Sequence, residues 1–353
     1  MQLFKESIMV AFAFVGVVVG AGFATGQEIF QFFTSNGIYS ISGIIVTGLI
    51  ITLAGVFVLN TGFVIQSHNH SESIRYYLHP IIARIFDIIL TLFLFSLAMI
   101  MTAGGASTIH ESFGLPYWLS SLILVLVILM TLFLKFERLI TVLGMVTPFL
   151  VIVVSIITIY YFITGDLNFS AANHFNKQHQ SLSLGWWFDG LNYASLQIAA
   201  AFSFLSVMGG RMQHRQSGLW GGLIGGIIIT LLLLMINFGL VTEFEHIQSV
   251  ALPTLLLASH ISPLLGTVMS IIMVLVIYNT IVGLMYAFAS RFTEPFSKGY
   301  FVLIIIMAII TFICTFIGFI SLIGKVFPIM GLFGFILLIP ILYQGFKHLI
   351  FSK

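Results

Sequence analysis

The first long apolar segment of the chain is interrupted by the stretch Gly20-Ala21-Gly22-Phe23-Ala24-Thr25-Gly26-Gln27-Glu28. Three glycines and a carboxylate therefore lie inside a segment that is otherwise apolar and long enough to cross a bilayer. Glycine weakens a helix by about 1 kcal/mol relative to alanine, and an acid at the bilayer centre costs about 2.5–3.5 kcal/mol. Irregular backbone is tolerated at that depth only where it packs in protein or lines a water-filled cavity. The stretch therefore predicts a broken helix beside a solute pathway.

The composition of the chain is that of a membrane protein. Of its 353 residues, 59% are hydrophobic and only 7% are charged, whereas soluble domains carry about 25% charged residues. We therefore predict an all-α polytopic membrane protein with a single transmembrane domain, residues 1–353, in contact with the lipid bilayer. The net charge of +2 comes without a basic run, which argues against a nucleic-acid partner. Cys314 is the only cysteine, so neither a disulfide framework nor a thiolate metal cluster is predicted.

About ten segments are long enough to span a bilayer, which takes about 20 helical residues. They are residues 7–34, 39–65, 81–109, 116–134, 139–163, 186–210, 217–242, 262–290, 299–316 and 319–346. Cytoplasmic segments carry an excess of Lys and Arg. With both termini cytoplasmic, only Lys177 and Lys325 of the thirteen Lys and Arg residues lie in the outer half, and this imbalance orients the spans.

Short matches within the sequence predict an internal repeat. Ile50-Ile51-Thr52-Leu53 reappears 178 residues later as Ile228-Ile229-Thr230-Leu231, and residues 143–148 reappear 180 residues later as residues 323–328. Five spans in each half, residues 1–163 and 186–353, give the halves opposite orientations, and such inverted repeats recur in secondary transporters. The repeat predicts that the sixth span breaks near residues 199–204, as the first span does near Gly20.

Broken first and sixth spans in a five-plus-five inverted repeat resemble the LeuT-like fold of the amino acid–polyamine–organocation superfamily. More narrowly, Gly-Ala-Gly-Phe-Ala-Thr-Gly-Gln-Glu-Ile at residues 20–29, followed by Phe32-Phe33, resembles the bacterial YkvI-like membrane proteins. The layout covers nearly the whole chain, whereas the motif covers residues 20–33. The resemblance implies a transporter in a bacterial cell membrane, but it does not imply a particular solute.

In the superfamily, substrate binds where the first span unwinds, and free N–H groups at a helix break can hold an anionic group. The resemblance implies that the amides of Ala21 and Gly22 hold a substrate carboxylate. Further substrate-binding candidates from the first, third and sixth spans are Phe23, Ser96, Phe202 and Ser203. The alternative is that the glycines only allow close helix packing, as small residues commonly do in membranes.

The resemblance also implies a sodium site beside the break. The carbonyls of Gly16 and Val19 would supply ligands from the first span, and Asn279 and Thr280 would supply them from the eighth. Asn279 stands where the family has a serine or threonine, but its side-chain oxygen can still bind a cation. Coupling to a proton, or no coupling ion, remains an alternative, as do simple interhelical hydrogen bonds from Asn279 and Thr280. No cofactor is predicted beyond Na⁺ or H⁺.

Glu28 and Lys325 are two opposite charges at similar depths in the first and tenth spans. Opposite charges inside a membrane usually pair, so we predict that they form an ion pair that closes the outer vestibule when substrate is bound. Two other roles remain open for Glu28, which could carry a proton or bind an ammonium-bearing substrate directly. A further alternative is that the two side chains do not pair and that each extends its charged group to the membrane interface.

Three further features of the sequence lie outside the predicted substrate and ion sites. Trp186, Trp187, Phe188 and Tyr193 are typical of an aromatic belt at the membrane interface, and a cation–π box is the alternative. His68, His70 and His79 lack the spacing of a metal site, so no metal is predicted. Residues 243–261 are predicted to form an outer lid, with residues 66–80 as the inverted counterpart.

The sequence favours a secondary active transporter of a small organic solute, an amino acid or a related zwitterion or amine, that works by alternating access. The alternative is a ligand-sensing receptor subunit with a transporter-like fold, as in spore-germinant receptors. An enzyme is not predicted, because no nucleophile–base pair or metal constellation shares one depth.

Overall fold

The computed structural model describes residues 2–67, 70–133, 146–165, 169–179, 184–294 and 297–351. All regular elements in these ranges are helices, as predicted. Seven of the described helices are long and apolar enough to cross a membrane. These are α4 (Tyr39–Ile65), α6 (Pro80–Phe113), α11 (Trp186–Arg211), α12 (Arg215–Thr242), α15 (Pro263–Phe292), α16 (Lys298–Thr315) and α17 (Phe319–Phe351).

The other three predicted spans are shorter or broken. Two are the apolar helices α7 (Tyr117–Leu132) and α9 (Val146–Thr164), although the predicted start of the fifth span at residue 139 lies outside the described residues. The third is divided into α1 (Gln2–Val18), α2 (Ala21–Thr25) and α3 (Gln27–Phe32), followed by the short helix η1 (Thr34–Asn36). The prediction of a polytopic all-α membrane fold is confirmed, and the predicted break in the first span lies at the glycine stretch.

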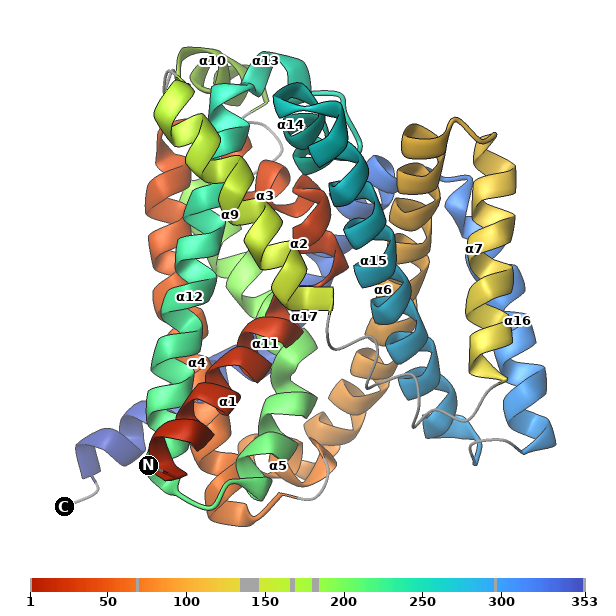
Figure 1. Ribbon diagram of the computed structural model, residues 1–353. Coiled ribbons are helices and arrows are strands. Elements are labelled where there is room, and N and C mark those ends of the chain that lie inside the picture. The colour runs from red at the N-terminus through yellow and green to blue at the C-terminus, as the bar shows by residue number, and fades with distance from the viewer. Residues whose placement is uncertain are drawn as a thin grey trace.

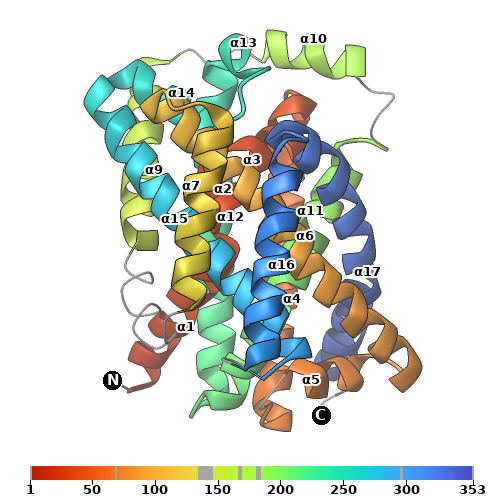
Figure 2. The same ribbon diagram turned by 90° about the vertical axis from the view of Figure 1, so that its right-hand side faces the viewer.

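The long helices form one bundle, with α7 and α16 side by side along one flank (Figures 1 and 2). The start of α1 and the end of α17 lie at the same end of the bundle, together with α5 (His70–Tyr77). The opposite end is covered by α10 (Ser170–His179), α13 (Phe244–Ile247) and α14 (Pro253–Ile261). A chain that crosses ten times must begin and end on the same side, so this arrangement agrees with the number of predicted spans.

Small residues bring the central helices close together. A Cβ atom on Gly48 of α4 would overlap the side chain of Thr230 of α12, and one on Gly226 of α12 would overlap Thr52 of α4. In α4 and α11, a Cβ atom on Gly62 would overlap the carbonyl of Ser206. Close approach of this kind is what holds helices together in lipid, where burial of apolar surface provides no driving force.

The predicted break in the sixth span is wrong, because α11 is continuous from Trp186 to Arg211. Ala199, Ala200 and Ala201 occupy the predicted breakpoint, and alanine is the strongest helix former. The polar residues before them bond to the neighbouring helix instead of marking unwound backbone. Asn192 donates its amide to the carbonyl of Pro328 at 3.2 Å, and the Ser195 hydroxyl donates to the carbonyl of Gly331 at 2.6 Å.

Hydrogen bonds between hydroxyl groups connect α5 to α4 and α11, at the end of the bundle where both termini lie. The Ser206 hydroxyl on α11 is hydrogen-bonded to Ser67 at 3.0 Å and to Ser73 of α5. The Tyr77 hydroxyl, also on α5, donates to Thr61 Oγ1 of α4 at 2.6 Å. Ser67 and α5 therefore pack against the ends of α4 and α11.

Glu6 fastens the start of α1 to the connection between α11 and α12. Its carboxylate accepts hydrogen bonds from the Gln213 amide at 2.6 Å, from the Ser217 hydroxyl at 2.6 Å and from His214 Nδ1 at 2.9 Å. Burial alone would raise the pKa of Glu6, but these hydrogen bonds together hold it below its ordinary value of 4.5. A lowered carboxyl pKa stabilises the folded state fully above pH 4.5, and that contribution is lost as the pH falls through the folded-state pKa.

We therefore expect Glu6→Gln to lower the melting temperature at pH 7. The difference from the wild type should shrink as the pH falls below 4.5, since protonated Glu6 then resembles glutamine. Thermal unfolding in detergent between pH 7 and pH 3.5 measures this difference. A gap that stays constant over that range would contradict the role assigned to the charge.

Candidate functional site

The first span breaks because two glycines take up backbone conformations that end a helix. Gly20 is extended, with φ −94° and ψ −162°, and its N–H donates to the Val18 carbonyl at 2.9 Å instead of continuing the helical pattern. Gly26 has φ +77°, in the left-handed region, and separates α2 from α3. Glycine adopts that conformation without the steric cost that other residues meet. The hydroxyl of Thr25 closes the short α2 by donating to the Gly22 carbonyl at 2.8 Å.

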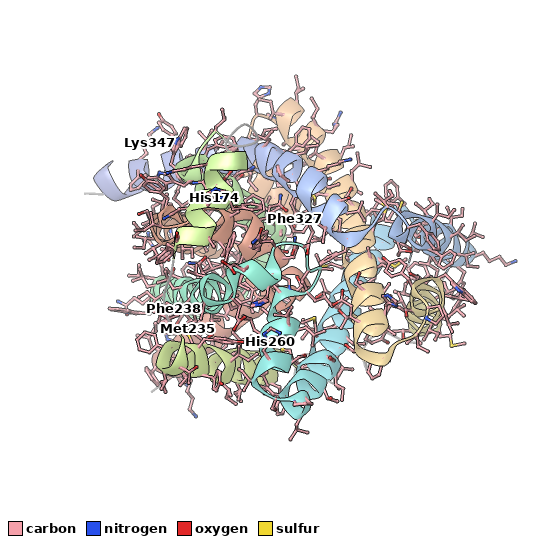
Figure 3. All side chains as sticks on the ribbon, turned by 90° about the horizontal axis from the view of Figure 1, so that it is seen from above. His174, Met235, Phe238, His260, Phe327 and Lys347 are labelled. Carbon is pink, nitrogen blue, oxygen red and sulfur yellow. The ribbon has the colours of Figure 1, made fainter. Side chains whose placement is uncertain are left out.

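A cavity of about 70 Å³ lies beside this break. It is bounded by residues from α1, α2, α3, α6, α11, α15 and α17 and the connection between α1 and α2. The lining residues are Val17, Val18, Gly20, Gly22, Phe23, Glu28, Phe93, Leu97, Met101, Leu196, Gln197, Ala200, Thr280 and Phe327. Seen from above (Figure 3), Phe327 lies inside the bundle, whereas Lys347 of the same helix lies at the periphery. The cavity is therefore central, mostly apolar and next to unwound backbone.

Glu28 is the charged residue of the cavity wall, and its side chain is buried at 4% exposure. Its Oε2 atom accepts hydrogen bonds from the Tyr193 hydroxyl at 3.3 Å and from Gln197 Nε2 at 3.2 Å. Both donors belong to α11 and both are neutral. The other carboxyl oxygen lies over Gly22, where a Cβ atom would overlap Oε1. The absence of a side chain at residue 22 is thus what leaves room for the carboxyl group.

The predicted ion pair between Glu28 and Lys325 is not formed in this structure. Lys325 is exposed, and the ion pairs found among the described side chains do not include it. Phe327 of the same helix lines the cavity. Lys325 precedes Phe327 by two residues, which corresponds to a rotation of about 200° around the helix axis. Lys325 therefore points away from the side that faces Glu28.

The structure brings together only some of the predicted substrate-binding residues. Gly22 and Phe23 line the cavity, whereas Ser96, Phe202 and Ser203 do not. The side chain of Ala21 lies outside the described residues. Phe202 is fully buried and packs edge-on against Tyr77 of α5, with ring centroids 6.1 Å apart. On α6, Phe93, Leu97 and Met101 line the cavity at a spacing of four, whereas Ser96 does not line it.

Of the predicted sodium ligands, Thr280 lies in the cavity wall with the end of α1. Its hydroxyl donates to the carbonyl of Val276, one turn earlier in α15, at 2.9 Å. The N–H of Val19 continues the helical pattern by donating to the Val15 carbonyl at 2.7 Å. Gly16, Val19 and Asn279 do not line the cavity. The sodium site remains a prediction.

Sequence reasoning missed the two residues that hold Glu28. Tyr193 was assigned to an aromatic belt, but its ring is fully buried and lies 5.1 Å from Phe33 and 5.3 Å from Phe32 between centroids. Gln197 follows Tyr193 by four residues and therefore lies on the same face of α11. That i, i+4 pair of polar residues on one face of the span was the available signal. Trp186, in contrast, stacks on Tyr39 near the end of the bundle, as a belt residue would.

Described residues contain no group of three or more His, Cys, Asp or Glu side chains arranged to hold a metal ion. His68 and the side chain of His70 lie outside the described part of the chain.

The segment predicted as an outer lid contacts the break directly. Thr254, in the first turn of α14, donates its hydroxyl to the carbonyl of Ala24 in α2. The Cα of Gly26 lies so close that a Cβ atom there would come 2.7 Å from Thr254 Cγ2 and 3.2 Å from the Thr254 backbone nitrogen. α14 thus packs against the helix break on the side away from the chain termini.

We expect Gly26→Ala to destabilise the protein more than Gly318→Ala. Both glycines have positive φ, at +77° and +91°, so alanine loses about 1–2 kcal/mol at either position. Only Gly26 also meets α14, since a Cβ atom on Gly318 has nothing within 4 Å. Thermal unfolding of the two variants in detergent measures the difference. Equal losses would show that α14 shifts away without cost.

Comparison with known proteins extends the resemblance seen in the glycine stretch. The chain is 26% identical over 327 residues to the uncharacterized membrane protein YkvI of Bacillus subtilis (strain 168), covering 91% of each chain. It is 24% identical over 329 residues to the uncharacterized protein YyaD of the same organism, covering 93% of this chain and 94% of YyaD. No protein-family model matches the chain.

The fold is similar to that of a solved transporter. A crystal structure of the manganese transporter from Eremococcus coleocola superposes with a TM-score of 0.61 and 16% identity, covering 94% of this chain and 76% of that one. Two variants of the same transporter give a TM-score of 0.59. At this identity the similarity shows the fold alone. The chain is a multi-pass membrane protein with a transporter-like fold.

Proposed function

We propose that the protein is a secondary active transporter of a small organic solute that carries an ammonium group, either an amine or an amino acid. The observation that supports this most is the buried carboxyl of Glu28 at the helix break, which faces a cavity and, among the described residues, accepts hydrogen bonds only from neutral donors. An isolated carboxylate in an apolar site is costly unless it is paired or protonated. An ammonium group in the cavity would pair with Glu28, and the apolar wall would hold the carbon skeleton.

The size of the cavity favours a small solute. About 70 Å³ is roughly half of an engineered cavity of about 150 Å³ that binds benzene. A ligand larger than a few heavy atoms would need helices to separate. Such widening is expected of a carrier that opens to one side at a time.

Reciprocal contacts support two inverted halves, residues 1–163 and 186–353, and alternating access between them. Thr52 and Thr230, which match in the sequence repeat, each lie against a glycine of the opposite helix. At one end α5 is bonded to α11 through Ser73, and at the other end α14 is bonded to the first span through Thr254. Breaking either set of hydrogen bonds while keeping the other would open the cavity to one side.

The donors around the cavity favour an organic cation over Mn²⁺, although the similar solved structure is a manganese transporter. Manganese prefers about six oxygen ligands, often from several carboxylates. Here the described lining side chains offer one carboxylate, the hydroxyl of Thr280 and the amide of Gln197, and the rest are apolar. A sodium ion held by Gly16, Val19, Asn279 and Thr280 remains the alternative to a proton as coupling ion. We further propose that the protein lies in a bacterial cell membrane with both of its termini in the cytoplasm.

A ligand screen on the purified protein tests this function. Amines and amino acids should raise the melting temperature, and counterflow of the stabilising solute should follow in proteoliposomes. Sodium dependence of either signal decides between the coupling ions, and MnCl₂ is included as a competitor. Stabilisation without counterflow would favour the ligand-sensing receptor, whereas stabilisation by Mn²⁺ alone would contradict the organic substrate.

A further inference from the structure

Among the described residues that line the cavity, Glu28 is the single ionisable carboxyl group, and no basic group balances it. From α1 and α2 the lining side chains are aliphatic or aromatic, from α6 they are Phe93, Leu97 and Met101, and from α17 the wall is Phe327. α15 contributes the hydroxyl of Thr280, and α11 contributes Gln197. The titratable neighbour is Tyr193, whose hydroxyl donates to Glu28 and therefore carries its proton. The net charge of the cavity thus depends on whether a proton or another cation is bound to the carboxyl group of Glu28.

We infer that a proton and the organic cation occupy Glu28 in turn, so that the protein exchanges one for the other across the membrane. This inference rests on the proposed transport function. When the cavity is empty, Glu28 holds a proton and the site is neutral. When an ammonium group enters, the O–H bond of Glu28 breaks, the proton leaves to water, and the carboxylate pairs with the cation. The site is neutral again, with one positive charge released for one bound.

The apolar wall makes this exchange obligatory. If Glu28 were ionised and unpaired, the conformational change would have to carry its charge past valine, leucine and phenylalanine side chains. An unpaired charge in such surroundings has a high free energy at membrane depth. The two occupied forms carry the same net charge and avoid this cost. Only a carrier loaded with one of the two cations therefore moves readily between its two open states.

The inference distinguishes substrate classes. A cation without a carboxylate, such as tetramethylammonium, balances Glu28 alone and leaves no place for a second positive charge. A zwitterion would bring a further negative charge and would need an additional cation, so it is expected to bind poorly without Na⁺. Exchange with protons is therefore inferred for organic cations.

Proton release upon binding tests the shared carboxyl without any transport. Methylammonium, ethylammonium and tetramethylammonium chlorides are added to the wild type in weakly buffered detergent, and the released protons are measured with a pH indicator. At a pH where empty Glu28 is protonated, we expect about one proton per bound cation and an apparent Kd that rises about tenfold for each unit that the pH falls. Glu6→Gln, which changes a carboxyl outside the cavity, should behave as the wild type. Binding without proton release, or no binding of any of the three cations, would overturn the inference.

Proteoliposomes separate this inference from the proposed function. Tetramethylammonium is loaded inside because its permanent charge prevents it from crossing lipid as a free base. Exchange predicts that its efflux acidifies the lumen and that valinomycin with K⁺ leaves the rate unchanged, since the exchange is electroneutral. Efflux that makes the lumen alkaline, or that proceeds without proton movement, would overturn exchange while leaving transport intact. Proton release in detergent without any flux would overturn the transport function and exchange with it.

Discussion

Glu28→Gln should weaken the binding of an ammonium-bearing ligand by more than about 100-fold. Removing one partner of a buried charge pair costs about 3–5 kcal/mol, because the other charge is left in an apolar site. Glutamine keeps the size of the side chain and can still accept the hydrogen bonds that Tyr193 and Gln197 donate at 3.3 and 3.2 Å. The fold should therefore survive while the charge is lost. Isothermal titration with the best ligand from the screen measures the affinity.

The matched control is Glu6→Gln, which removes a carboxylate at the end of the bundle and not in the cavity. It should bind ligand as the wild type does, despite its lower stability. If Glu28→Gln is folded, as judged by its melting temperature, and binds within about threefold of the wild type, Glu28 does not hold the cation.

Gly22→Ala should reduce ligand affinity by at least about tenfold, whereas Gly20→Ala should leave it nearly unchanged. A Cβ atom on Gly22 overlaps Glu28 Oε1 and approaches Cδ, so the carboxyl group must leave its bonds to α11. In enzymes, misplacing a group by about 1 Å can lower the reaction rate about 100-fold, and we expect ligand affinity to be similarly sensitive to the position of the carboxyl group. Gly20 lines the same cavity, yet a Cβ atom there has nothing within 4 Å.

The two glycine variants test whether the position of the Glu28 carboxyl group matters, because both variants retain the group itself. Both keep Glu28, both add one methyl group to the broken span, and alanine tolerates the extended backbone of Gly20 at φ −94°. Ligand affinity and melting temperature are measured for both. Equal affinities for the two variants would show that the contact between residues 22 and 28 has no part in binding.

Ten spans and a broken first helix could be predicted because they depend on local rules. Apolar segments of about 20 residues cross a bilayer whatever surrounds them, and Gly20 and Gly26 weaken the helix at their own positions. The same local reasoning failed at α11. There, Asn192 and Ser195 suggested unwinding, but they bond to the carbonyls of Pro328 and Gly331, more than a hundred residues later in the chain.

The candidate site was predicted only in part. Gly22, Phe23, Glu28 and Thr280 were identified, and all four line the cavity. Ser96 and Phe202 do not line it, and hydropathy could not show this because it does not reveal how a buried helix is rotated about its axis. A residue one position away points about 100° elsewhere. Lys325 shows the same effect: its depth suggested a partner for Glu28, and the rotation of α17 directs it outward.

By itself, the sequence determined that the chain crosses a membrane many times and that its first helix breaks beside a carboxylate. Composition and glycine content fix these properties, because solvation and backbone freedom act residue by residue. Only the tertiary structure decided that Glu28 meets Tyr193 and Gln197 of α11, residues 165 and 169 positions away, and that Gly22 leaves room for it. Such pairings depend on the relative rotation and spacing of packed helices, which no local pattern in the chain specifies.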